Sequence, residues 1–311
     1  MPSAAEILFT TITIVQTGTG ITLNTGIVSF SFQNLKKQPT FNPANVIYFS
    51  MGLVNAFMQL VLIAQNLIVC FWPQLCFIKE IELTLTFLMF SLIYCSYWHT
   101  GWLCAYYCIN INNFSHQRII GLKRLLSSFL PQILLLSTIG SVILSFVAIW
   151  VVNMAFLVQT STNSTEDMSV YTANIVMPTG YILTATFLGC ILPFVLTLIS
   201  TGVTALNLIK HIMKMKQNIS GHSRPNLQAL ISATRTMILF LTLSAVFYIA
   251  ELLLFSTSKR STSDAITVIV WFIMTSFPSV EGAIIIQANP RLRKMILEKF
   301  CSRRPSSNVI D

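Results

Sequence analysis

Charged residues are scarce in this chain, and acidic ones are fewer than basic ones. Asp, Glu, Lys and Arg make up 9% of the 311 residues, while hydrophobic residues make up 54%. A water-soluble fold of this length needs more charge at its surface, since ordinary domains carry about 25% charged residues. The composition therefore predicts an integral membrane protein, and one membrane domain accounts for the length.

Two further absences narrow the class of protein. Residues 1–6 contain no Lys or Arg, and the apolar run after them is too long for the core of a signal peptide, so we expect the first membrane span there. A disulfide framework is also lacking, because five of the seven cysteines lie in apolar runs. Neither a cleaved leader nor a disulfide-stapled secreted domain is expected.

Long apolar segments divide the chain into helices. A membrane span needs about 20 apolar residues, because hydrocarbon offers no water to the backbone and a helix satisfies its own polar groups. Polar stretches expected as loops cover 33–42, 112–125, 159–174, 210–226 and 256–264. The pattern predicts an all-α fold, a seven-transmembrane helix bundle, with spans at 7–33, 43–71, 80–110, 126–152, 176–209, 228–256 and 265–287.

The basic residues fall on one side of this topology. That side carries Lys36, Lys37, Arg118, Lys123, Arg124, Lys210, Lys214, Lys216, Arg224, Arg235 and the tail residues Arg291, Arg293, Lys294, Lys299, Arg303 and Arg304. The other side carries only Lys79, Lys259 and Arg260. Basic loops stay in the cytoplasm during insertion, which predicts an extracellular N-terminus over 1–6, a membrane domain over 7–287 and a cytoplasmic tail over 288–311.

This orientation also explains the net charge of +9. The basic loops are expected to contact anionic membrane lipid or a cytoplasmic protein, and no nucleic acid. Of three Asn-X-Ser/Thr sequons, the one at Asn163 lies on the extracellular side, so we expect glycosylation there.

Two glutamates lie inside spans, where a charge costs roughly 2.5 to 3.5 kcal/mol at the helix centre. Glu251 follows Phe247 by one helical turn, and an acid beside an aromatic ring suits a cationic ligand. A second interpretation leaves Glu251 at the outer headgroups, in water or paired with a loop cation. For Glu281 we expect an internal polar network with Asn24 and Asn55.

Three motifs resemble those of the taste receptor type 2 family, the bitter taste receptors. The end of the third span, Asn113-Phe114-Ser115-His116, is similar to the family's Asn-Phe-Ser-His stretch. Leu192-Pro193-Phe194 with Lys210-His211, and Pro278-Ser279 with Asn289, follow the family patterns in the fifth and seventh spans. Asn55 and Glu281 depart from the family's Arg and His, which marks a divergent member.

The resemblance implies a G-protein-coupled chemosensory receptor at the plasma membrane, which binds small bitter compounds and is no enzyme. Its agonist would lie between helices near the outer face, and Glu251 would select basic amines. The implied ligand-binding residues are Gln65, Asn66, Met89, Ile93, Ser96, Thr179, Thr186, Ser244, Phe247, Glu251, Trp271 and Met274.

The family couples to a heterotrimeric G protein of the gustducin type or another inhibitory class. The implied G-protein-facing residues are Tyr107, His116, Lys123, Arg124, Lys210, His211, Lys214 and Lys216. No cofactor, metal ligand set or catalytic residues are expected. A vomeronasal type 1 receptor is the near alternative, and a polytopic transporter or channel subunit is the alternative from another class.

Overall fold

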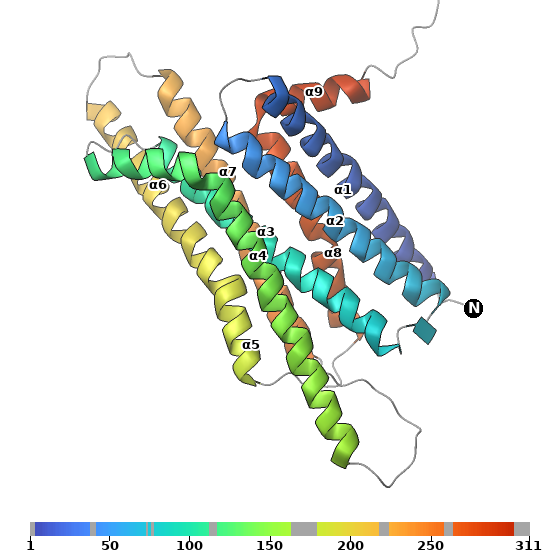
Figure 1. Cartoon of the computed structure of the whole chain (residues 1–311). Coiled ribbons are helices and arrows are strands. Elements are labelled where there is room, and N and C mark those ends of the chain that lie inside the picture. The colour runs from blue at the N-terminus through green and yellow to red at the C-terminus, as the bar shows by residue number, and fades with distance from the viewer. Residues whose placement is uncertain are drawn as a thin grey trace, which may run out of the picture.

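The computed structural model describes residues 4–37, 42–72, 74–75, 78–111, 117–162, 179–217, 224–257 and 264–301, and these contain helices and no strand. Figure 1 shows them as one elongated bundle. The helices are α1 (Ala4–Lys37), α2 (Pro43–Phe71), α3 (Lys79–Ile111), α4 (Gln117–Thr162), α5 (Thr179–Thr186), the π-helical turn η2 (Phe187–Ile191), α6 (Leu192–Gln217), α7 (Arg224–Thr257), α8 (Asp264–Ala288) and α9 (Pro290–Cys301).

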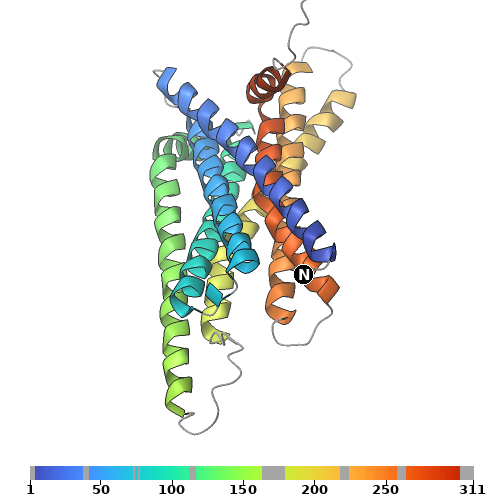
Figure 2. The same ribbon diagram turned by 90° about the vertical axis from the view of Figure 1, so that its right-hand side faces the viewer.

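Among the described residues, six segments are long and apolar enough to cross a membrane. They are Pro43–Phe71, Glu80–Ile111, Ser128–Val147, Leu183–Met213, Leu230–Leu253 and Val268–Ala288, where the fourth joins α5, η2 and α6 into one helix. Helix α1 is not among them, because Thr, Gly, Gln and Asn interrupt its apolar sequence. It nevertheless packs along α2 and α8 and completes the bundle as the seventh helix (Figure 2). The predicted helical membrane bundle is confirmed.

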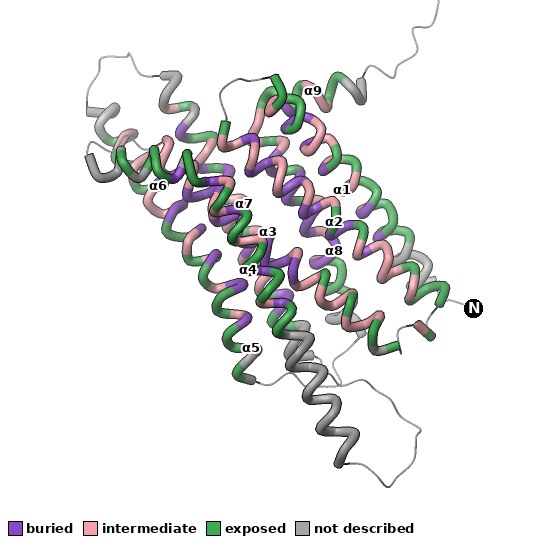
Figure 3. The backbone as a smooth tube through the Cα atoms, in the orientation of Figure 1, coloured by how far each residue is buried: buried purple, intermediate pink, exposed green. Residues whose placement is uncertain are grey.

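Helix α3 lies at the centre of the bundle, in contact with α2, α4, α6 and α7. Two buried apolar clusters surround it. The first, which includes Tyr48, Leu103 and Leu292, lies toward the end of the bundle that carries α9, here called the α9 end. The second, which includes Ile93 and Phe247, lies in the opposite half. Figure 3 shows buried residues along the axis and exposed ones outside, where the many exposed apolar side chains suit lipid.

Several helices extend beyond the expected spans. Helix α4 begins at Gln117 and α6 continues to Gln217, so parts of the stretches expected as loops, 112–125 and 210–226, are helical. The expected tail contains α9, whose first turn is capped by the side chain of Asn289, which accepts hydrogen bonds from the amides of Arg291 and Leu292 at 3.1 and 3.2 Å. Polarity of the sequence predicts where a membrane span ends and not where its helix ends. The helices continue past the spans because Lys, Arg, Gln and Leu favour helix in water as well.

Prolines mark the irregular places in two helices. Pro131 lies inside α4, and Figure 1 shows the first turns of α4, in green, bent away from the rest. Pro193 follows η2, and a proline ring crowds the carbonyl four residues before it, so a locally widened turn relieves the clash. The π turn matters for the site because it sets the direction of Cys190.

Candidate functional site

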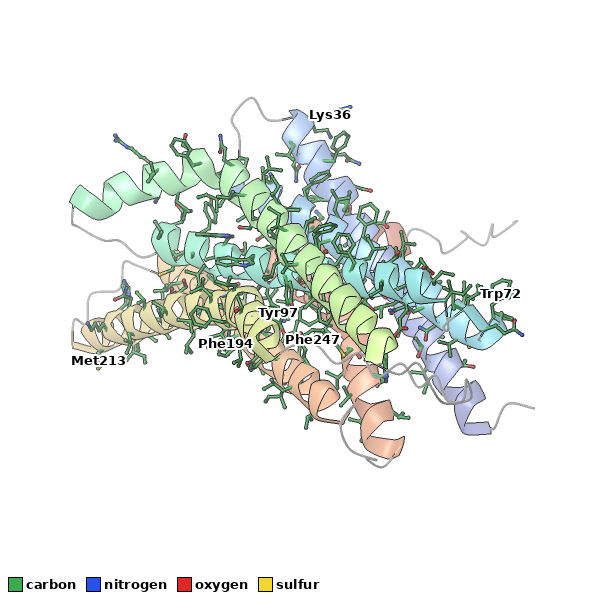
Figure 4. The ribbon with its side chains drawn as sticks, turned by 60° about the horizontal axis from the view of Figure 1, so that its bottom comes forward. Lys36, Trp72, Tyr97, Phe194, Met213 and Phe247 are labelled. Carbon is green, nitrogen blue, oxygen red and sulfur yellow. The ribbon has the colours of Figure 1, made fainter. Side chains whose placement is uncertain are left out.

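Three aromatic rings from three helices meet in the half of the bundle opposite α9. The ring of Phe247 on α7 lies 4.3 Å from that of Phe277 on α8 and 6.0 Å from that of Tyr97 on α3, measured between centroids. Tyr97 and Phe277 are 6.1 Å apart. Figure 4 shows Tyr97 and Phe247 near the middle of the molecule. All three rings belong to the second apolar cluster. Aromatic rings at such spacings stabilise one another.

Glu251 stands one helical turn along α7 from Phe247. Its side chain is only 5% exposed, and its Oε2 accepts a hydrogen bond from the thiol of Cys190 at 3.6 Å. Cys190 belongs to η2, where Gly189 packs against the ring of Tyr94 so closely that a β-carbon there would collide with it. The π turn and this glycine together place the thiol against the carboxyl.

The surroundings of Glu251 are poor in compensating charge. Within the described ranges the ion pair found is Lys294 with Glu298 on α9, so no described cation pairs with Glu251. The side chain of Lys79, and Lys259 and Arg260, lie outside the described residues. The low exposure favours a buried acid over one that reaches water at the headgroups.

Three further polar atoms in this half of the bundle are buried and lack a hydrogen bond to any described residue. They are the hydroxyl of Tyr97, which interacts electrostatically with Glu251, the hydroxyl of Ser91 on α3 and Oε1 of Gln65 on α2. An unpaired buried polar atom costs about 1–3 kcal/mol. The Tyr97 hydroxyl, close to an acid that has no described cation, is suited to a ligand that supplies its partner.

The residues predicted to bind ligand are spread around this cluster. Phe247, Ile93 and Met274 belong to it and Met89 packs against it. Gln65, Asn66 and Thr186 are half-buried, Ser244 is buried, and Trp271 is 37% exposed on the outside of α8. The side chain of Thr179 is not among those described. Ser96 lies deeper and contacts Glu281 instead of this cluster.

Sequence reasoning missed three members of the site, Tyr97, Phe277 and Cys190. Tyr97 stands four residues after Ile93, so continuing the same face of α3 by one more turn would have included it. Phe277 stands three residues after Met274, so helical spacing on α8 would have included it as well. Cys190 gave no signal, since its direction depends on a π turn that periodicity does not predict.

Glu281 on α8 forms a second buried polar group, closer to the middle of the bundle. Its two carboxyl oxygens accept hydrogen bonds from Ser96 at 2.8 Å and from Thr100 at 2.6 Å, both on α3. Asn55 on α2 lies beside the carboxyl, as expected. Asn24 instead donates from Nδ2 to the carbonyl oxygens of Gly20 and Pro278, so it joins α1 to the backbone of α8.

Comparison with known proteins decides the family. The model of the family described as "Taste receptor protein (TAS2R)" matches residues 1–304. The chain belongs to the taste receptor type 2 family. It is 26% identical over 291 residues to taste receptor type 2 member 40 of Gallus gallus, covering 92% of this chain and 91% of the relative. Member 9 of Papio hamadryas is 25% identical over 298 residues, covering 96% and 94% of the two chains.

A human relative gives the same result. Taste receptor type 2 member 2 of Homo sapiens is 25% identical over 291 residues, covering 92% of this chain and 93% of the relative. The chain is therefore a bitter chemosensory receptor, from a receptor family and not an enzyme family. The match also favours this receptor over the vomeronasal and transporter alternatives.

The described residues among those predicted to face a G protein lie at the α9 end of the receptor. Tyr107 and Tyr48 share a hydrogen bond between their hydroxyls, and Lys123 Nζ donates to the carbonyl of Asn110 at 3.5 Å. Arg124 and Lys210 are exposed and His211 is half-buried. His116 and the side chains of Lys214 and Lys216 lie outside the described residues. The described members therefore come from α3, α4 and α6 at one end of the bundle.

Proposed function

We propose that this taste receptor detects small amphipathic molecules, including basic amines, in the half of the bundle that contains Glu251. The observation that carries the proposal is the burial of Glu251 with a single weak donor, the Cys190 thiol, and no described cation. An ammonium group placed there would neutralise the acid. The rings of Tyr97 and Phe247 would contribute cation–π and apolar contact.

Flexible side chains next to the rings support tolerance for several ligand shapes. Met89 and Met274 both contact the second apolar cluster. Methionine is unbranched and polarisable, so it adapts to different surfaces. Apolar contact would supply most of the affinity, and Glu251 and Tyr97 would orient the polar end of the agonist.

We further propose that the α9 end faces the cytoplasm of a cell whose plasma membrane holds the receptor. Exposed basic residues there are Lys36, Lys37, Arg124, Lys210 and, on α9, Arg291, Arg293 and Lys294. Basic residues are retained on the cytoplasmic side. A gustducin-type or other inhibitory G protein would dock on this end. On the opposite side, Asn163 would carry a glycan; it lies outside the described residues.

Signalling would require the agonist to bind the active arrangement of helices more tightly than the resting one. The bend of α4 and the π turn before Pro193 are places where the helices depart from regular geometry, which would let one end of the bundle respond to the other.

The experiment is agonist-evoked calcium release in cells that express the receptor with a chimeric G protein. A panel of bitter compounds, both amines and neutral molecules, should give responses that disappear without the receptor or without the G protein. Ion or solute flux that persists without the G protein, and no calcium response, would contradict the proposal and indicate a transporter or channel.

A further inference from the structure

Glu281 sits where three helices meet, and the side chains that hydrogen-bond to it carry hydroxyl or amide groups. Its carboxyl on α8 is 1% exposed. Ser96 and Thr100, one turn apart on α3, are equally buried and donate to its two different oxygens. Asn55 on α2 is fully buried beside it. The group therefore gathers four oxygen-bearing side chains from three helices.

The two hydroxyls beside Glu281 are placed to stabilise an ionised carboxylate. Each carboxyl oxygen lies within hydrogen-bonding distance of one hydroxyl, and a hydroxyl can donate to a carboxylate. Two neutral hydroxyls leave the negative charge itself uncompensated. Buried charges in proteins are normally paired with an opposite charge or with a metal ion.

Protein cations do not supply this compensation within the described ranges. Glu281 forms no ion pair there. The nearest candidate along α3, His99, contacts Ser50, Cys95 and Thr138 instead, so its ring lies toward α2 and α4. No described protein cation therefore compensates a negative charge on Glu281.

The same region has a surplus of acceptors. Oδ1 of Asn55, Oδ1 of Asn24 and Oε1 of Gln59 are all buried without a donor among the described residues. Asn24 Oδ1 lies against Gly282, next to Glu281, and Gln59 lies one turn from Asn55 on α2, where its Nε2 donates to Ser279 at 2.8 Å. Unpaired oxygens beside an uncompensated carboxylate attract a hard cation.

We propose that the receptor binds a sodium ion at this place, with Glu281, Ser96, Thr100 and Asn55 as its ligands. A hydroxyl that donates its hydrogen to the carboxylate retains lone pairs for the ion. Asn55 offers its unpaired Oδ1. One carboxylate balances one monovalent charge, whereas Mg²⁺ or Ca²⁺ would leave a buried positive charge and requires more anionic ligands. The ion joins α2, α3 and α8, and the proposal is independent of the agonist assigned above.

The test is the thermal unfolding midpoint of the purified full-length receptor in nanodiscs, in sodium chloride and in caesium chloride at equal ionic strength. Caesium replaces the usual organic cations because an amine would also interact with Glu251. A bound ion stabilises the folded state, and we expect sodium to raise the midpoint by about 2–5 °C. Glu281→Gln, which keeps the size and hydrogen-bonding capacity of the side chain, should abolish the difference between the salts.

Two other variants make the result specific. Thr100→Val keeps the shape and the carboxylate but removes one ligand, and should reduce the sodium effect even if Glu281→Gln does not fold. Glu251→Gln, which removes the other acid that is buried among the described residues, should retain the full effect. Equal midpoints in both salts for the wild type would overturn the proposal and show that a proton neutralises Glu281. An unchanged sodium effect in Glu281→Gln or Thr100→Val, or its loss in Glu251→Gln, would overturn it as well.

Discussion

The thiol of Cys190 donates to the carboxyl of Glu251 across 3.6 Å, and this contact joins the π turn η2 to α7. A thiol is a weak donor, so the acid keeps most of its capacity to bind a stronger partner. The hydroxyl of Tyr97 lies in the same surroundings, buried and unpaired within the described ranges. The carboxyl of Glu251 and the hydroxyl of Tyr97 are therefore suited to form hydrogen bonds with an agonist.

Tyr97→Phe separates the two roles of this side chain. Removing a buried hydroxyl that has no described partner should leave the thermal midpoint unchanged or slightly higher, because the desolvation penalty of about 1–3 kcal/mol disappears. Agonists with a polar group should lose potency, about 3- to 10-fold for a net hydrogen bond of about 1 kcal/mol. Calcium dose–response curves and thermal unfolding measure the two effects. A lower midpoint with unchanged potency would contradict this interpretation.

Phe247→Leu tests whether the aromatic cluster contacts agonist. Phe240 offers a matched control, since it lies on the same helix, is also 1% exposed and belongs to the other apolar cluster. Both substitutions to Leu should lower stability by about 1–3 kcal/mol. Only Phe247→Leu should shift the agonist concentration for half-maximal calcium response, once surface expression is equalised. Equal shifts in both variants would indicate a general packing effect.

The sequence predicted much of this fold, because the physics that determines it is local. Twenty apolar residues without a charge indicate a membrane helix wherever they occur, so the spans of α2, α7 and α8 were placed to within a few residues. The extent of α4 was underestimated, since Gln117 to Leu125 is polar enough for a loop and yet continues the helix. Polarity reports the membrane boundary, not the helix boundary.

The contacts within the site were harder to predict from the sequence than the helices. The cost of charge in lipid singled out Glu251 and Glu281 but left open whether Glu251 is buried or reaches water, whereas the neighbourhood of Glu281 and Asn55 was predicted correctly. The partners were not, because Cys190 and Thr100 come from helices whose rotation depends on contacts between distant segments. A π turn shifts the helical register by one residue, and the sequence carries no rule for it beyond the following proline.

Gly282→Ala should destabilise the receptor by bringing α8 into collision with α1. A β-carbon at this position would lie 2.8 Å from Oδ1 of Asn24 and 3.2 Å from its Cγ. Asn24 is held by two hydrogen bonds and does not move freely. We expect a loss of about 1–3 kcal/mol, seen as a lower thermal midpoint of the purified receptor.

Gly140→Ala on α4 is the control for that substitution. A β-carbon there meets nothing within 4 Å, and alanine favours helix over glycine by about 1 kcal/mol. Its midpoint should be unchanged or higher. If both alanine variants behave alike, the close approach of α1 and α8 at Gly282 is not a determinant of the packing.

The proposal that Glu251 recognises basic amines is tested most directly by Glu251→Gln, assayed by calcium release with a matched pair of agonists. One agonist should carry an ammonium group and the other a neutral group of the same shape. Loss of a buried charge pair costs about 3–5 kcal/mol, so the variant should respond at least 100-fold more weakly to the amine and almost normally to the neutral compound. An equal loss of response to both compounds would contradict the account, because Glu251 would then support the fold and not the recognition of charge.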